Sequence, residues 1–127
     1  MLKKIRIETG GPDANKIAKG DRRVHTTTSG QDLPGNPGRR VADQVQWLAD
    51  SAPGQPPGSF TIRFRYIAGS PFAPGHGPTN PDDVKVPPGG PETVSQAPGT
   101  YKYDVYRNDA QGNPTGDPTD DPDVIIE

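Results

Sequence analysis

The chain has two imidazoles, His25 and His76, and no cysteine. His25 lies in a run of β-branched residues, whereas His76 lies in a segment rich in glycine and proline. A metal site would require the two to converge, and a lone histidine provides no ligand spacing. We therefore interpret both as surface histidines. The absence of cysteine excludes disulfides, iron–sulfur clusters, thiol catalysis and thiolate metal sites.

Oxygen-bearing side chains are concentrated near the end of the chain, as a hard cation such as calcium requires. They are Asn108, Asp109, Asp117, Asp120, Asp121 and Asp123. Their spacing does not match an EF-hand loop, and the three prolines of the segment indicate a solvated turn. We keep Asp117, Asp120 and Asp121 as weak calcium candidates and favour the turn.

Arginines recur in pairs, at Arg22-Arg23, at Arg39-Arg40, and at Arg63 and Arg65 on the outward face of one expected strand. They could form a basic stripe for a phosphate or an acidic partner. A solvated strand face is the interpretation that we favour. The net charge of −2, with mixed signs, lacks the basic footprint of nucleic-acid binding, so we expect no nucleic-acid partner.

No pattern of residues indicates catalysis. Asp43 or Asp104 beside Tyr103 could suggest acid–base chemistry, but no second carboxylate, histidine or nucleophile is placed by a motif. The serines also lack the context of a nucleophile elbow. We therefore expect no enzymatic activity and no cofactor. An enzyme would require a hidden site in the loop Gly69–Asp83, around His76.

The 127 residues are enough for one domain. Proline and glycine are abundant, at 17 and 16 residues, and only 28% of residues are hydrophobic, which approaches the composition of disordered chains. The aromatic and β-branched residues nevertheless cluster in alternating runs, which predicts short strands joined by long loops. The expected strands are Lys3–Glu8, Arg22–Thr28, Arg39–Ala49, Ser59–Tyr66, Val84–Val86, the run after Pro98-Gly99, and Asp123–Glu127.

The pattern predicts a single-domain antiparallel Greek-key β-sandwich of about seven or eight strands over residues 1–127. Tyr101, Tyr103 and Val105 share one face of its central strand. Val41, Val45 and Trp47 are the inward positions of another strand. The segments Gln31–Gly38 and Asn108–Asp121 are expected to be loops, and Asp13–Gly20 to hold at most one helical turn.

Three stretches together resemble the cupredoxin-like sandwich family. They are Val45-Gln46-Trp47, Phe60-Thr61-Ile62-Arg63-Phe64, and Pro98-Gly99-Thr100-Tyr101-Lys102-Tyr103. An immunoglobulin-like sandwich is the near alternative. The resemblance implies a copper ligand set that this chain lacks, because Val105 stands at the cysteine position and the only methionine is Met1. No histidine stands in Tyr106-Arg107-Asn108 or near Ser59, so we expect no type-1 copper and a metal-free domain.

The basic start Met1–Ile7 is not followed by an apolar stretch, so it is not a signal peptide, and no window approaches a membrane span. We therefore expect a cytoplasmic protein without a membrane partner. The expected function is a non-catalytic protein-binding or assembly module, a small intracellular β-sandwich of bacterial type. Its partner would be another protein or a second copy, contacted through sheet edges and long loops. The candidate contact residues are Phe72, His76, Arg63 and Arg65.

The alternative is a structural subunit of a repeating assembly such as a phage virion, filament or shell. In such an assembly the segments Met1–Ile7 and Val124–Glu127 would add to the sheets of neighbouring subunits.

Overall fold

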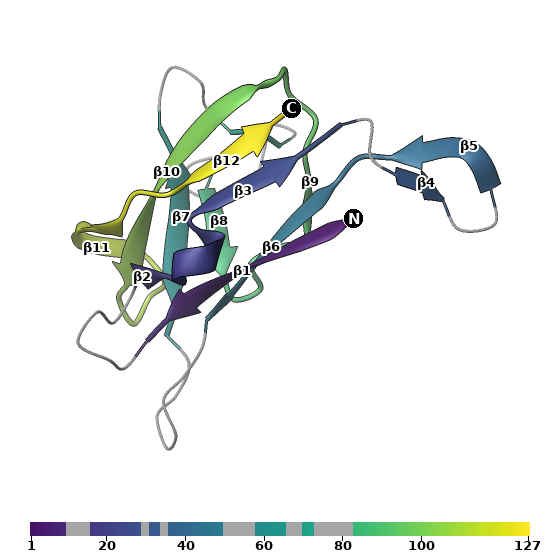
Figure 1. The fold of residues 1–127 in the computed structure, drawn as a ribbon. Helices are drawn as coiled ribbons and strands as arrows, with labels where there is room; N and C mark the ends of the chain where they lie inside the picture. The colour runs from purple at the N-terminus through teal and green to yellow at the C-terminus, as the bar shows by residue number, and fades with distance from the viewer. Residues whose placement is uncertain (10–15, 29–30, 34–35, 50–57, 66–69, 73–82) are drawn as a thin grey trace.

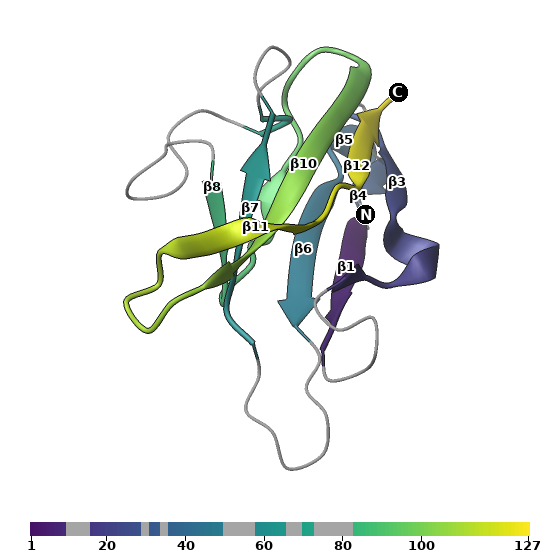
Figure 2. The ribbon, with the colours of Figure 1, turned by 90° about the vertical axis from the view of Figure 1, so that its left-hand side faces the viewer.

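A computed structural model describes residues 1–9, 16–28, 31–33, 36–49, 58–65, 70–72 and 83–127. In these residues the chain forms an all-β sandwich in which two mixed sheets pack together (Figures 1 and 2). The described residues contain twelve strands, one short 3-10 helix, η1 (Lys19–Asp21), and no α-helix.

The first sheet contains the N-terminal strand in an inner position. Its order is β2 (Lys16–Ile17), β1 (Leu2–Glu8), β6 (Gln44–Ala49) and β9 (Glu92–Thr93). β1 pairs with β6 in parallel along six residues, while the other pairs are short and antiparallel. Ile5 and Ile7 of β1 are fully buried, as the two-residue alternation of this strand predicts.

The second sheet is built around β10, the strand that follows Pro98-Gly99. Its order is β3 (Arg23–Thr26), β12 (Asp123–Ile126), β10 (Gly99–Asn108), β7 (Phe60–Phe64) and β8 (Asp83–Val86), with β11 (Pro114–Asp120) also paired to β10. The prediction of a central strand is confirmed. The prediction of a wholly antiparallel sandwich is wrong, because β1 pairs with β6 and β12 with β3 in parallel.

Two expected loops contain strands. β4 (Gln31–Leu33) and β5 (Asn36–Val41) form a hairpin that extends away from the two sheets in Figure 1. β11 occupies half of the expected polar turn Asn108–Asp121. β5 and β11 carry proline. A strand at a sheet edge tolerates proline because one side of its backbone is not needed for the ladder.

The core lies between the two sheets and is centred on Trp47. Its indole contacts Tyr103 edge-on, with ring centroids 5.6 Å apart, and its Nε1 donates a hydrogen bond of 3.3 Å to the Tyr103 hydroxyl. Phe64 and Phe72 pack around the same indole, also edge to face. Such aromatic pairs contribute about 0.5–1.5 kcal/mol each beyond the area that they bury.

Gly89 joins β8 to β6. Its N–H donates to the Lys85 carbonyl at 2.7 Å, and its carbonyl accepts from the Trp47 N–H at 2.8 Å. Its φ is +74°, and a Cβ at this position would lie 2.1 Å from the Trp47 carbonyl oxygen. Glycine is therefore required here both by conformation and by space.

Of the three inward positions expected between residues 39 and 49, Val45 and Trp47 are fully buried, but Val41 is 43% exposed. The reason is that Val41 belongs to the β4–β5 hairpin, outside the sandwich, and not to the strand that holds Trp47. Tyr66, expected at the end of β7, lies outside the described residues.

Candidate functional site

Arg63 is half-buried on the second sheet, where its guanidinium is paired with a neighbouring strand. Its Nε and Nη2 donate to the two carboxylate oxygens of Asp83 at 3.0 and 2.8 Å, and Asp83 is fully buried. The hydrogen bond to Asp83 raises the pKa of Arg63. The guanidinium also lies 5.6 Å from the ring centre of Tyr106. This pair ties β7 to β8 and leaves Arg63 little freedom to bind a partner.

Phe72, another candidate contact, is 1% exposed and packs against Trp47 and Phe64 in the core. Its backbone forms an isolated bridge with Val94. The ring is therefore part of the core and is not available on the surface of the folded domain. His76, the remaining loop candidate, lies outside the described residues.

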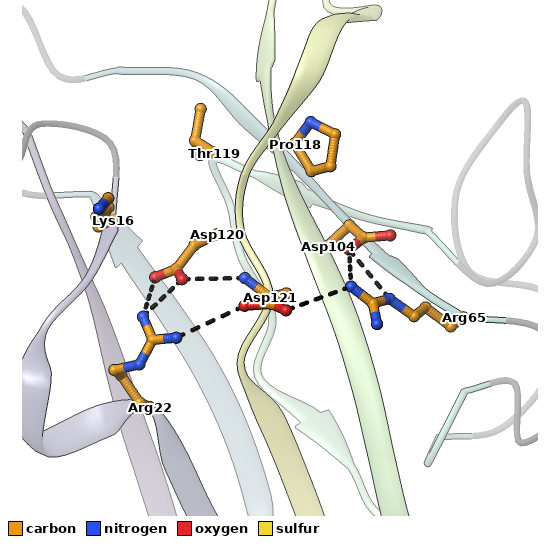
Figure 3. Close-up of a pocket in the computed structure, with 8 residues that line it drawn as sticks. All are labelled: Lys16, Arg22, Arg65, Asp104, Pro118, Thr119, Asp120 and Asp121. Atoms are coloured by element: carbon orange, nitrogen blue, oxygen red, sulfur yellow. Dashed lines mark hydrogen bonds and ion pairs between the residues drawn. The ribbon is translucent and has the colours of Figure 1, made fainter.

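Arg65 is exposed and follows β7 directly. Its Nε and Nη2 donate to Asp104 Oδ1 at 3.1 and 2.8 Å, and this hydrogen bonding raises its pKa. The same Nη2 lies 3.6 Å from Asp121 Oδ2. Arg65 is the one candidate contact residue whose guanidinium, among those that the structure describes, reaches a cavity (Figure 3).

Asp120 anchors the opposite wall of that cavity. Its side chain is 5% exposed, and both of its carboxylate oxygens lie 2.6 Å from Arg22 Nη1. The backbone N–H groups of Ile17 and Asp121 also donate to it, at 2.9 and 3.0 Å. Burial acts against the charged form, but the hydrogen bonds from Arg22 and the two amides outweigh it and lower the pKa of Asp120.

The cavity has a volume of about 560 Å³ and is open to solvent on one side. It is lined by Lys16, Arg22, Arg65, Asp104, Pro118, Thr119, Asp120 and Asp121. Figure 3 shows the Asp121 carboxylate between the two guanidiniums, with Arg22 on one side and Arg65 on the other. These residues come from β2, β10 and β11, from the residues that flank β3 and β7, and, for Asp121, from the link between β11 and β12.

The three weak calcium candidates do not form an oxygen-ligand cluster. Asp120 is saturated by Arg22 and two amides, and Asp121 faces guanidiniums. Asp117 is exposed on β11 and does not line the cavity. Within the described ranges, no group of three or more histidine, aspartate or glutamate side chains is arranged to hold a metal ion.

The candidate acid–base groups all have structural partners. Asp43 is buried and accepts from the Met1 ammonium at 3.0 Å and from the Thr27 N–H at 3.1 Å. Burial raises the pKa of Tyr103, whose hydroxyl accepts from Trp47. His25, exposed on β3, contacts Glu127. His25, Asp43 and Glu127 line one open cavity of about 250 Å³, in which Asp43 is held by Met1 and Thr27 and His25 contacts Glu127.

One backbone edge of β1, within the segment Met1–Ile7 that the sequence analysis names for strand addition, is unpaired over part of its length among the described residues. Because β1 is parallel to β6, alternate residues direct their N–H and C=O to β6, and Met1 does so by accepting from Gln44 at 2.9 Å. Arg6 points the other way: its carbonyl accepts from Ala18, and its N–H donates to Asp21. The N–H and C=O groups of Leu2 and Lys4 point the same way as those of Arg6, away from β6. No described strand pairs with Leu2 or Lys4 on that side.

The exposed apolar side chains lie at the same end of the molecule. Among the described residues, the large exposed hydrophobic side chains are Met1, Leu2 and Val41, at 49%, 41% and 43% exposure. Leu2 is in register with Gln44, three residues after Val41, so all three lie where β1 begins and the β4–β5 hairpin leaves the sandwich (Figure 1). We call Met1, Leu2, Lys4 and Val41 the β1 end. Exposed apolar side chains are common singly on protein surfaces, so the significance of this group comes from the unpaired strand edge beside it.

None of the described helical residues forms a segment long and apolar enough to cross a membrane. Comparison of the chain with protein-family models, with curated proteins and with solved structures finds no match.

Proposed function

We propose that this protein is a non-catalytic protein-binding module that contacts its partner through the β1 end. The observation that carries the proposal is the coincidence of an unpaired backbone edge, at Leu2 and Lys4, with the exposed apolar side chains Met1, Leu2 and Val41. An extended segment of a partner that pairs with this edge would continue the first sheet by one strand.

The absence of catalysis remains part of the proposal. It is supported by the use of polar groups within the fold: Asp43, Asp83 and Asp120 each accept hydrogen bonds that tie one part of the chain to another. Carboxylates that hold the fold together in this way are poorly placed to exchange protons with a substrate. A cupredoxin-like or immunoglobulin-like identity also stays a proposal. The expected lack of type-1 copper is supported by Val105, which is buried in the core within β10.

A different protein is a better partner than a second copy. β1 carries Lys3, Lys4 and Arg6 within four residues, and antiparallel pairing of two copies of this strand would bring like charges close together. Lysines on an edge strand also act against unselective pairing. We therefore place the subunit of a repeating assembly second. Of the two terminal strands named for such an assembly, β1 is the one with an unpaired edge, since β12 is enclosed by β3 and β10.

The sharpest test removes only the outward N–H of β1. Lys4→Pro deletes this donor while leaving the residues that bond to β6 unchanged, and Lys4→Ala removes the same charge but keeps the donor. We expect Lys4→Pro to reduce capture of the partner from native-host lysate at least about tenfold relative to Lys4→Ala, since main-chain bonds supply the affinity of strand addition.

A second pair of variants tests the apolar side chains. Val41→Glu adds a charge to the β1 end, and Gln111→Glu adds the same charge to the exposed β10–β11 turn at another site. We expect Val41→Glu to lose capture of the partner and Gln111→Glu to retain it.

Light scattering on a size-exclusion column distinguishes the binding module from the repeating assembly. A wild-type multimer that Lys4→Pro reduces to a monomer would favour the repeating assembly. Equal capture by Lys4→Pro and Lys4→Ala would contradict the proposed edge.

A further inference from the structure

The cavity of Figure 3 combines tight and loose ion pairs. Arg22 to Asp120 and Arg65 to Asp104 are tight, with distances of 2.6 to 3.1 Å. Asp121 differs from both carboxylates: Arg22 Nη2 lies 3.7 Å from its Oδ1, and Arg65 Nη2 lies 3.6 Å from its Oδ2. These distances exceed those of hydrogen bonds, so Asp121 is held by charge and not by directed donors.

Asp121 is also the exposed member of the cluster. Its side chain is 59% exposed, whereas those of Asp104 and Asp120 are 16% and 5% exposed. Its backbone is fixed independently of the carboxylate, because its N–H donates to Asp120 Oδ1 at 3.0 Å. The carboxylate can therefore leave the two guanidiniums without disturbing the tight pairs.

We propose that this cavity is a binding site for a small oxyanion, a phosphate or carboxylate group, and that Asp121 is its intramolecular stand-in. Each Asp121 oxygen faces a different arginine, which is the arrangement a bound oxyanion would adopt by presenting one oxygen to Arg22 and another to Arg65. The volume of about 560 Å³ exceeds what a carboxylate alone fills. Lys16 adds an ammonium to the wall.

Charge explains why Asp121 controls the affinity. Asp120 and Asp104 each neutralise one arginine, so with Asp121 in place the six charged wall residues sum to zero. Without the Asp121 charge, an anion that approaches the two guanidiniums no longer meets a like charge within a few ångströms. The site is distinct from the β1 end, because the two share no residue, so either proposal can fail alone.

The test is a titration of the full chain with inorganic phosphate at pH 7.5 and constant ionic strength, followed by amide and arginine side-chain NMR signals, with acetate as the carboxylate arm. Asp121→Asn keeps the size of the side chain and removes its charge, and it should bind phosphate about tenfold more tightly than wild type. Asp117→Asn removes the same charge from exposed β11 outside the cavity and should change binding by less than about threefold.

Arg65→Gln, in the Asp121→Asn background, should abolish most of the gain in phosphate affinity, since one of the two guanidiniums is lost. Dispersed amide signals will confirm that each variant is folded. Tighter binding of phosphate than of acetate would identify the ligand group as a phosphate. Tighter binding of acetate would identify it as a carboxylate. Equal phosphate affinity of Asp121→Asn and Asp117→Asn, or binding that is insensitive to Arg65→Gln, would overturn the proposal.

Discussion

The two terminal strands have opposite surroundings. β12 lies between β10 and β3, and both sides of its backbone are paired: Val124 is in register with Tyr101 on one side and with Val24 on the other. β1 is paired along its whole length only with β6, and β2 reaches just Ile7 and its neighbour. The exposure of a terminal strand's backbone therefore follows from which strands flank it.

The largest expected effect is on the free energy of unfolding, and it distinguishes β12 from β1. Val124→Asp places a carboxylate in a fully buried position of β12, without a partner, and should lower the free energy of unfolding by more than about 4 kcal/mol or prevent folding. Leu2→Asp, at a position that is 41% exposed in β1, should change it by less than about 1 kcal/mol. Urea unfolding measures both. Comparable losses would show that β1 is as enclosed as β12.

The next effect concerns β6, on which β1 depends. Gly89→Ala would place a methyl group 2.1 Å from the Trp47 carbonyl oxygen in a residue with positive φ, and should cost about 3 kcal/mol or more. Gly112→Ala is the matched control, since Gly112 also has positive φ but open space around it, and should cost about 1–2 kcal/mol. Thermal unfolding at neutral pH compares them, and equal losses would remove the steric explanation.

A smaller effect, dependent on pH, is expected beside β3, the strand that encloses β12. The pKa of Asp120 is lowered from 3.8 in the folded protein, so its carboxylate stabilises the fold above pH 3.8, and this contribution is lost as the pH falls below that value. Arg22→Gln should cost about 1–3 kcal/mol at pH 7 and reduce the loss of stability in acid. Arg65→Gln, whose pair with Asp104 is more exposed, should cost less than about 1 kcal/mol. An unchanged acid profile in Arg22→Gln would contradict this role of the pair.

The sequence predicted the strands whose apolar residues alternate. β7 and β10 were recognisable because Phe60, Ile62 and Phe64, and then Tyr101 and Tyr103, face one core. β11 was missed since it lies on the surface, with no buried residue and two prolines, so it carries no apolar alternation. Burial of Phe72 was not predictable either, because its contacts with Trp47 and Phe64 are made by a residue outside the long strands.

The candidate sites were harder to predict than the fold. The charged cavity joins Arg22 to Asp120, residues 98 positions apart, and the free edge of β1 exists because β1 pairs in parallel with β6. Neither long-range pairing leaves a local pattern in the sequence. For the arginines the sequence favoured a solvated strand face, whereas the structure pairs Arg63 with the buried Asp83.

The most direct test of the β1 end is amide hydrogen exchange of Lys4 and Ile125, in the free protein and with its captured partner. The Lys4 N–H points away from β6, whereas Ile125 lies inside the second sheet between β10 and β3. We expect exchange of Lys4 to be at least about a hundredfold faster than that of Ile125 in the free protein, and to slow at least about tenfold in the complex, with Ile125 unchanged. Protection of Lys4 equal to that of Ile125 in the free protein, or no change at Lys4 in the complex, would contradict the account.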